Sequence, residues 1–367
     1  MVVDYGQLKP ARVFLPTFFV EPKVIMHPYR MDAYTREFVK RELSERLGRD
    51  VSDNDLFPAS PHRARIEAPE FWGIVDELRA VAYERPVTKD ELQSMLAATR
   101  HEGIWLQKTW PRNRGGAPGC WLSGAPSLPA HIEWPSRKLP SGQSNPLYFA
   151  AQFNCAELKR VFPGSLLPEC GTVFFFYDPI FGCRDDWNGP AKIIHTPEDS
   201  SGLPIRQMPA LAPLGDLRSD PWFHEDMVLP PEGELAPRQN VTLLPLTAYT
   251  ETRFHCRAYD DAVRALVKPF EDRFRQSDYV APRGSLFDRL FPKRPEEPPK
   301  QYNHNLFVGP CDGDWSEATT RPILTLVSGD EDIGVSTPND IPITFKAPIG
   351  ATGMFSLEEA EVQEWDG

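Results

Sequence analysis

The spacing of apolar residues in the first hundred positions predicts helices. Between residues 31 and 47, apolar residues recur at the interval of one helical face, and Gly48 follows where a helix commonly ends. These apolar residues are Tyr34, Phe38, Leu43 and Leu47. We therefore expect a helix over residues 31–47 that buries this face.

Two further helices are expected before residue 104. One begins at Pro69, because proline is favoured at the first helical position. Its apolar face consists of Phe71, Val75, Leu78 and Ala82. The other follows Thr88, which forms a capping box with Glu91, while Val87 and Leu92 are placed to close a hydrophobic staple. Three short amphipathic helices must bury their apolar faces, so we expect them to form a cap that packs on another layer of the protein.

Beyond residue 104 the pattern changes to short strands separated by proline and glycine. Residues 147–153 alternate between two sets of side chains, which indicates a strand with two unlike faces. Residues 171–178 form a continuous apolar run between turn formers, which indicates a strand buried on both sides. Further strands are expected at residues 191–195, 241–246, 323–327 and 341–345.

These elements predict an α+β fold, with a mixed or antiparallel sheet core of two weakly related halves and an N-terminal helical cap. The halves share the order of a Gly-Pro turn, a proline-led strand and a second strand, at residues 124–178 and 309–345. One later helix is expected from Asp260, with a kink at Pro269. We divide the chain into a mainly helical segment, residues 1–104, and an α+β domain, residues 105–367. A proline-rich surface loop is expected at about residues 286–300.

Several short motifs in the second segment follow one another in a characteristic order. They are residues 123–129 (SGAPSLP), 133–135 (EWP), 146–154 (PLYFAAQFN) and 171–178 (GTVFFFYD). In order and spacing they resemble the YwqG-like family, a bacterial domain family of unknown function. Residues 304–310 and 322–330 are similar to the C-terminal part of that family. The resemblance extends over residues 105–367 and implies no particular activity.

Composition limits the class of protein. A hydrophobic share of 41% and a charged share of 25% are typical of a globular protein, and 39 prolines favour short elements. No apolar run is long enough to predict a membrane span, and the N-terminus lacks the features of a signal peptide, so we expect a cytoplasmic protein. The six cysteines form no CxxC pair, which favours reduced thiols over disulfides or a zinc site.

Charge is concentrated near the end of the chain. Residues 301–367 contain 12 acidic residues and only two basic residues, Arg321 and Lys346. Such a surface repels phosphate backbones, which argues against nucleic-acid binding, and it attracts a basic protein or a cation. A solvated acidic face that promotes solubility is the other interpretation.

The candidate chemistry is sparse. Phosphate-binding loops, serine elbows and HExxH motifs are missing, so the sequence predicts no catalytic residue, cofactor or metal. Trp134 provides a large ring on a rigid bend. Gln152 and Asp178 are polar residues in apolar strands, where each must be hydrogen-bonded or face a cleft. Acidic turns add hard oxygen groups at Asp312, Asp314, Asp330 and Asp332.

We therefore expect a non-catalytic protein-binding module that restrains a basic protein partner through an acidic, aromatic-rich surface. The acids after residue 300 and the 9 Trp, 10 Tyr and 22 Phe residues motivate this prediction. The alternative is an enzyme of unrecognised type that acts on a small molecule in a cleft between the two halves. Convergence of Gln152, Asp178 and Asp330 in one pocket would favour the enzyme, whereas pairing with backbone groups would not.

Overall fold

The computed structural model describes residues 31–58, 61–109, 115–178, 188–189, 191–220, 237–249, 254, 256–275, 306–307, 320–326 and 343–364. Two compact units are present: a helical unit (Met1–Arg100 and Tyr249–Glu271) and a sheet unit (His101–Ala248 and Asp272–Gly367). Segment 249–271 thus groups with the N-terminal helices, although the sequence pattern placed it in the domain of residues 105–367.

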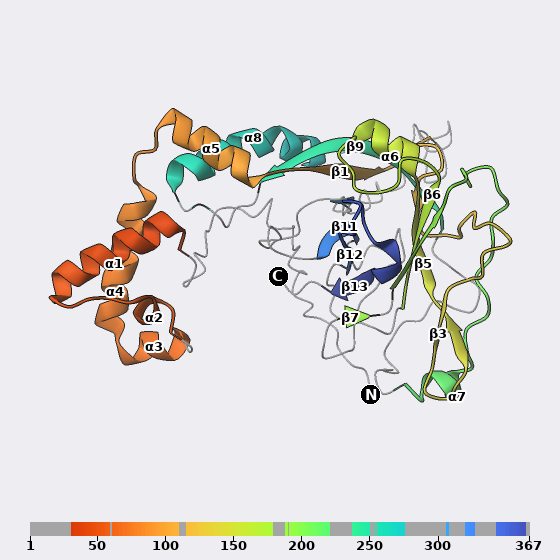
Figure 1. The fold of residues 1–367 in the computed structure, drawn as a ribbon, viewed down its shortest axis with the longest axis horizontal. Coiled ribbons are helices and arrows are strands. Elements are labelled where there is room, and N and C mark those ends of the chain that lie inside the picture. Colours follow the sequence, from red (N-terminus) through yellow and green to blue (C-terminus); the bar gives the residue numbers. More distant parts are fainter. Residues whose placement is uncertain are drawn as a thin grey trace, which may run out of the picture. The chain divides into compact units, whose positions relative to one another are not determined.

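The helical unit is built from α1 (Ala33–Leu47), α2 (Asp53–Leu56), α3 (Pro61–Glu67), α4 (Pro69–Tyr83), α5 (Lys89–Thr99) and most of α8 (Arg257–Arg275) (Figure 1). Helix α1 begins after Asp32, whose side chain accepts a hydrogen bond from the Thr35 amide (2.7 Å), and it ends at Gly48, where φ is 62°. The predicted helices at residues 31–47 and from Pro69 are confirmed.

Helix α5 also begins where the sequence indicates. The Thr88 side chain accepts a hydrogen bond from the Glu91 amide (3.2 Å). The Glu91 carboxylate pairs with Arg85 at 2.6 Å, so only the Thr88 half of the predicted capping box is formed. Helix α8 starts at Arg257 and contains Pro269.

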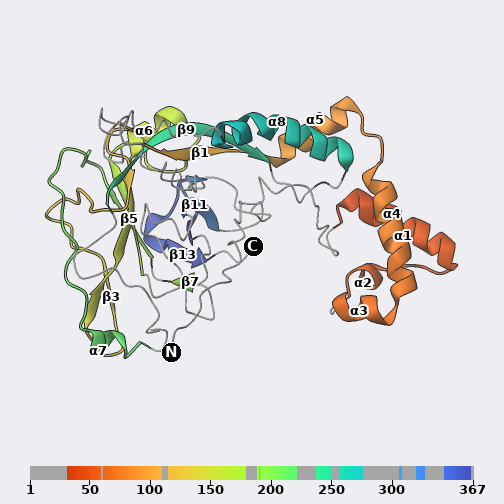
Figure 2. The same ribbon diagram turned by 180° about the vertical axis from the view of Figure 1, so that it is seen from behind.

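Two apolar clusters stabilise the helical unit. One joins α1, α2 and α4 through Val39, Leu43, Val51, Leu56, Trp72, Val75 and Leu78. The other joins α5 to α8 through Met95, Cys256, Tyr259, Val263 and Val267, and Figure 2 shows these two helices side by side. The predicted buried face of α1 was wrong at two positions, because Tyr34 is 46% and Leu47 40% exposed. Thr35, Val39 and Leu43, spaced four residues apart, form the buried face.

The sheet unit contains one eleven-stranded sheet among the described residues. Its strands are β1 (Arg100–Lys108), β2 (Trp121–Leu122), β5 (Tyr148–Asn154), β6 (Thr172–Tyr177), β7 (Asn188–Gly189), β8 (Ala191–Thr196), β9 (Gln239–Tyr249), β10 (Leu306–Phe307), β11 (Thr320–Leu326), β12 (Ile343–Pro348) and β13 (Glu361–Glu364). Their order is β7-β13-β12-β11-β10-β1-β9-β2-β5-β6-β8. A separate pair, β3 (Ser136–Lys138) and β4 (Ser144–Pro146), and the short helices α6 (Cys155–Val161), α7 (Leu214–Leu217) and η3 (Leu357–Glu359) complete the unit.

Two antiparallel meanders run outward from the central strands β1 and β9. One is β2-β5-β6-β8 and the other is β10-β11-β12-β13. Each has a register shift, between Phe149 and Ala151 in β5 and between Pro322 and Leu324 in β11. The rings of Phe175 in β6 and Phe345 in β12 lie 5.3 Å apart, so equivalent strands face each other across one apolar core. The predicted α+β fold with an antiparallel sheet is confirmed.

Strand burial agrees with the pattern in β6 and differs in β5. All residues of β6 are buried, as the continuous apolar run indicated. All residues of β5 are buried too, because its two faces pack into different clusters, with Phe153 in the large core and Phe149 in a smaller aromatic cluster. The strands expected at residues 191–195, 241–246, 323–327 and 341–345 correspond to β8, β9, β11 and β12. The predicted loop at residues 286–300 lies outside the described residues.

Candidate functional site

One segment of the sheet unit lies over the aromatic face of β5 and β6. We call residues 123–147 the cover segment. Leu128 and Trp134 of this segment pack with Phe149, Phe174 and Phe176 of the strands. Three of the residues predicted from sequence to form a binding site, Trp134, Gln152 and Asp178, meet at this layer.

Gln152, in β5, is fully buried and binds Ser127 of the cover segment. Its Oε1 accepts a hydrogen bond from the Ser127 amide (2.9 Å), and its Nε2 donates to the Ser127 hydroxyl (2.8 Å). Both ends of the side-chain amide are therefore engaged by one residue. A buried amide that is paired in this way avoids the free-energy cost of desolvation and holds the backbone at Ser127 in place.

Trp134 is held from two sides. Its indole Nε1 donates to the Leu147 carbonyl at 2.9 Å, and its ring packs edge-on against Phe176 with centroids 5.4 Å apart. The side chain is only 8% exposed. Its large flat ring thus closes the cover segment on itself and onto β6.

Asp178 directly follows β6 and takes part in a buried ion-pair triad. Its Oδ2 pairs with Nε of Arg137 in β3, and Nη1 of Arg137 pairs with Oδ2 of Asp220 at 2.7 Å. The three side chains are between 0% and 10% exposed. Burial, with a smaller contribution from the charge of Asp178, raises the pKa of nearby Tyr148, so its phenol stays protonated.

Trp134, Gln152 and Asp178 thus each anchor a different part of the cover segment. Asp312, Asp314, Asp330 and Asp332 lie outside the described residues. In the parts of the chain that are described, no cluster of three or more His, Cys, Asp or Glu side chains is arranged to hold a metal ion. The four described cysteines, Cys120, Cys155, Cys170 and Cys256, are free thiols.

A second candidate site consists of aromatic rings on α1 and the guanidinium groups beside them. It was not predicted as a site from the sequence. The rings of Tyr34 and Phe38 stack with centroids 6.3 Å apart. The guanidinium of Arg41 lies 5.5 Å from the Phe38 ring, and that of Arg85 lies 4.0 Å from the Tyr34 ring. We call these four residues the aromatic ladder. The helical spacing of Tyr34 and Phe38 was the available signal, but it was interpreted as part of a core face.

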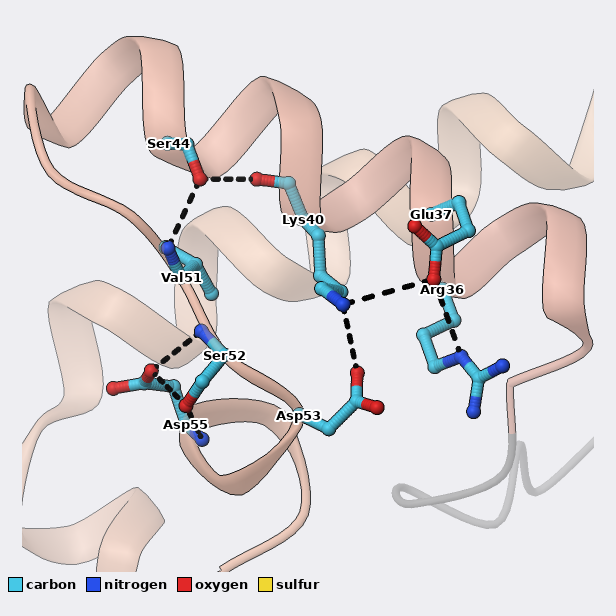
Figure 3. A network of polar contacts seen from close by, with 8 residues as sticks. All are labelled: Arg36, Glu37, Lys40, Ser44, Val51, Ser52, Asp53 and Asp55. Carbon is cyan, nitrogen blue, oxygen red and sulfur yellow. Dashed lines mark hydrogen bonds and ion pairs between the residues drawn. The ribbon is translucent and has the colours of Figure 1, made fainter.

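Helix α1 also carries a polar network (Figure 3). Lys40 Nζ lies 3.1 Å from Asp53 and 3.7 Å from Glu37, and the hydrogen bond to Asp53 is the main cause that raises the pKa of Lys40. The Ser44 hydroxyl donates to the Lys40 carbonyl (2.8 Å) and accepts from the Val51 amide (3.0 Å). These hydrogen bonds hold the turn between α1 and α2 in place. The charge of Lys40 is paired with acidic side chains from the same two helices.

Comparison with known proteins identifies one related family. Residues 121–303 match the family model of a domain of unknown function (DUF1963). This match contains the cover segment and its anchors Gln152 and Asp178. No curated protein matches the chain. Among the described residues, no helix is long and apolar enough to cross a membrane.

Proposed function

We propose that this chain is a non-catalytic protein-binding module, in which the sheet unit is a scaffold and the helical unit carries a contact surface. The aromatic ladder is the observation that carries the proposal. Tyrosine, phenylalanine and arginine are enriched at the centres of protein interfaces, because they combine large rigid area with planar donors. Tyr34 is 46% exposed, and the Arg41 side chain is 63% exposed.

The distribution of exposed apolar side chains supports the same assignment. Large apolar side chains are exposed at Tyr34, Leu47, Ile66, Val81 and Leu266 in the helical unit, and at Leu203, Ile205 and Leu214 in the sheet unit. The helical unit holds most of them although it is the smaller unit among the described residues. Exposed apolar surface of this kind is a common feature of sites that bind another protein.

The anchors of the cover segment favour a scaffold over a catalytic cleft in the sheet unit. Gln152 binds Ser127, and Asp178 binds Arg137, so each polar group already has a protein partner. An enzyme that used these two residues to line a cleft would need their polar atoms to face a substrate. We therefore rank the enzyme alternative second.

We further propose that the partner is a basic protein, which this chain restrains. The chain has a formal net charge of −12 at pH 7, and 12 of its 52 acidic residues follow residue 300. Such a charge steers basic partners and repels acidic ones. We also propose that the DUF1963 match and the motifs that resemble the YwqG-like family mark the same scaffold, in a bacterial cytoplasmic protein.

The test compares variants of the full chain. The tagged wild-type protein is used to recover partners from its source cell, and each recovered partner is purified and titrated by calorimetry. Y34S/R41S should bind about tenfold more weakly or worse, as expected for central interface residues. I205S is the matched control, because Ile205 is 45% exposed in the sheet unit, outside the unit that carries the proposed contact surface. Equal affinity for the wild type and Y34S/R41S would remove the aromatic ladder from the proposal.

A second variant tests the acidic surface. D312N/D314N/D330N/D332N should associate more slowly with the same partner, and its affinity should depend less on salt. Unchanged kinetics and salt dependence would contradict a basic partner recognised through these acids.

A further inference from the structure

Arg238, which directly precedes β9 in the sheet unit, has a guanidinium that is held in one orientation. Its Nε donates to Oδ1 of Asn240 at 2.7 Å, and its Cζ lies 3.7 Å from the centre of the Trp121 ring. Trp121 is 1% exposed, and its indole Nε1 donates to the Ala125 carbonyl at 3.3 Å. A fixed ring and a fixed Nε together set the plane of the guanidinium.

Glycines allow one turn to approach Arg238 and a second turn to approach Asn240 and Val241 closely. A Cβ atom at Gly124, where φ is 71°, would lie 3.0 Å from the backbone of Arg238. The Asn240 side chain donates to the Gly115 carbonyl at 2.9 Å, and a Cβ at Gly116 would lie 2.8 Å from the Val241 carbonyl oxygen. Both turns therefore support Arg238 and Asn240 by backbone alone.

Within the described parts of the chain, the charge of Arg238 has no counter-charge. Among the described residues no carboxylate pairs with it, and its Nη1 and Nη2 make no hydrogen bond, whereas Arg137 lies between two carboxylates. Partial burial lowers the pKa of Arg238, and no neighbouring charge contributes to that shift. Removing a cation from water without a partner is unfavourable, so an anion at this position would be stabilising.

We propose that Arg238 anchors a carboxylate-binding site, in which Nη1 and Nη2 donate a pair of hydrogen bonds. A guanidinium with Nε already engaged presents these two donors in a planar fork that matches the two oxygens of a carboxylate. A carboxylate also matches the single positive charge, whereas a phosphate dianion would leave a negative charge without a partner. This site does not depend on the proposed protein-binding function.

The test follows arginine side-chain resonances by NMR in the full chain with isotope-labelled arginine. The Arg238 Nε–H signal is assigned by its loss in R238K. Acetate should shift this signal saturably, with a dissociation constant on the order of 100 mM, as expected for one ion pair at a partly exposed site. Sodium chloride at matched ionic strength should not. Arg160, which already pairs with Glu157 at 2.8 Å, is the internal control and should show no saturable shift.

Two variants separate recognition from folding. R238K keeps the charge and loses the fork, so saturable acetate binding should disappear while the unfolding midpoint shows whether the chain is folded. N240A keeps the guanidinium and frees Nε, so we expect binding to weaken about fivefold. If R238K does not fold, the Arg238 Nε–H signal is assigned by its shift in N240A, and the wild-type and N240A titrations decide the question.

The source of the carboxylate is distinguished with two short peptides. One is capped at both ends and contains an internal Asp; the other contains only glycine and has a free C-terminus. If the Asp peptide binds more tightly than acetate, the carboxylate is a side chain of a protein. If the glycine peptide binds more tightly than acetate, the carboxylate is a chain terminus. Equal binding of both peptides and acetate identifies a free organic acid. The proposal is overturned if acetate acts like chloride, if inorganic phosphate saturates the signal more tightly than acetate, or if folded R238K still binds acetate.

Discussion

Two groups of ion pairs, one in the helical unit and one in the sheet unit, lie in opposite environments. In the helical unit, Lys40 and Asp53 pair with 26% and 54% of their side chains exposed (Figure 3). In the sheet unit, Arg137 is 10% exposed and lies between Asp178 and Asp220, which are almost fully buried. Water and salt compete for the first pair and are excluded from the second. The position of the charge, more than the residue type, therefore decides how much a pair contributes.

This contrast indicates what holds each unit together. The helical unit relies on two apolar clusters and on caps such as Asp32 and Thr88, and several of its ion pairs are exposed, although the side chains of Arg79 and Arg85 are only 2% and 9% exposed. In the sheet unit, buried polar contacts attach the cover segment to the strands. Substitutions of buried polar residues should therefore have larger effects than substitutions of exposed ones.

Arg137→Ala should cause the largest loss. It leaves the carboxylates of Asp178 and Asp220 buried without their counter-charge, and breaking a buried ion pair costs about 3–5 kcal/mol. Urea unfolding of the full chain, followed by tryptophan fluorescence, measures the free energy of unfolding. R137M/D178N/D220N, which removes the three charges together, should regain part of the loss. A loss in R137A below about 1 kcal/mol would place this pair with ordinary surface pairs.

Gln152→Ala should have the next largest effect. The Ser127 amide would lose its acceptor inside the protein, and an unsatisfied buried donor costs about 1–3 kcal/mol. Hydrogen exchange at the Ser127 amide should accelerate together with the fall in unfolding free energy. Ser127→Ala is the comparison: it keeps the Ser127 backbone donor paired but leaves Gln152 Nε2 without its acceptor, so exchange at the Ser127 amide distinguishes the two variants and the loss of stability does not. Equal acceleration of exchange at this amide in both variants would show that the backbone bond does not hold the segment.

Asp260→Asn should change the pH dependence of the helical unit. Burial raises the pKa of Asp260 above its ordinary value, although the Tyr83 hydroxyl donates to it at 2.8 Å. The folded state then holds the proton more tightly than the unfolded state, so stability is present at low pH and decreases as pH rises through the raised pKa. In D260N this decrease should disappear from unfolding curves recorded between acid and neutral pH. A profile parallel to the wild type would contradict the assignment.

Lys40→Ala should have the smallest effect. It removes an exposed partner of Asp53 and Glu37, so we expect a small decrease in the unfolding midpoint at low salt. Because salt screens exposed charges, the difference from the wild type should vanish in high salt. A decrease as large as that of R137A, or one that persists in high salt, would remove the distinction between the exposed and the buried ion pairs.

Elements with local signals were predictable from the sequence, and their packing partners were not. Gly48 and Thr88 marked helix ends because caps depend on neighbouring residues. The buried face of α1 was partly wrong because hydrophobicity favours Tyr34, whereas contact with α4 selects Thr35 and Val39. The grouping of α8 with the N-terminal helices depends on Met95 and Tyr259, which are far apart in sequence.

For the candidate site, the sequence alone determined that Gln152 and Asp178 had to be satisfied, because an unpaired polar group in an apolar strand is costly. Only the tertiary structure decided how. Ser127 and Arg137 are distant in sequence from the groups they bind, and no local pattern relates them. The aromatic ladder and the orientation of Arg238 likewise depend on contacts between separate segments, since Arg85 reaches Tyr34 and Arg238 reaches Trp121 only in the folded chain.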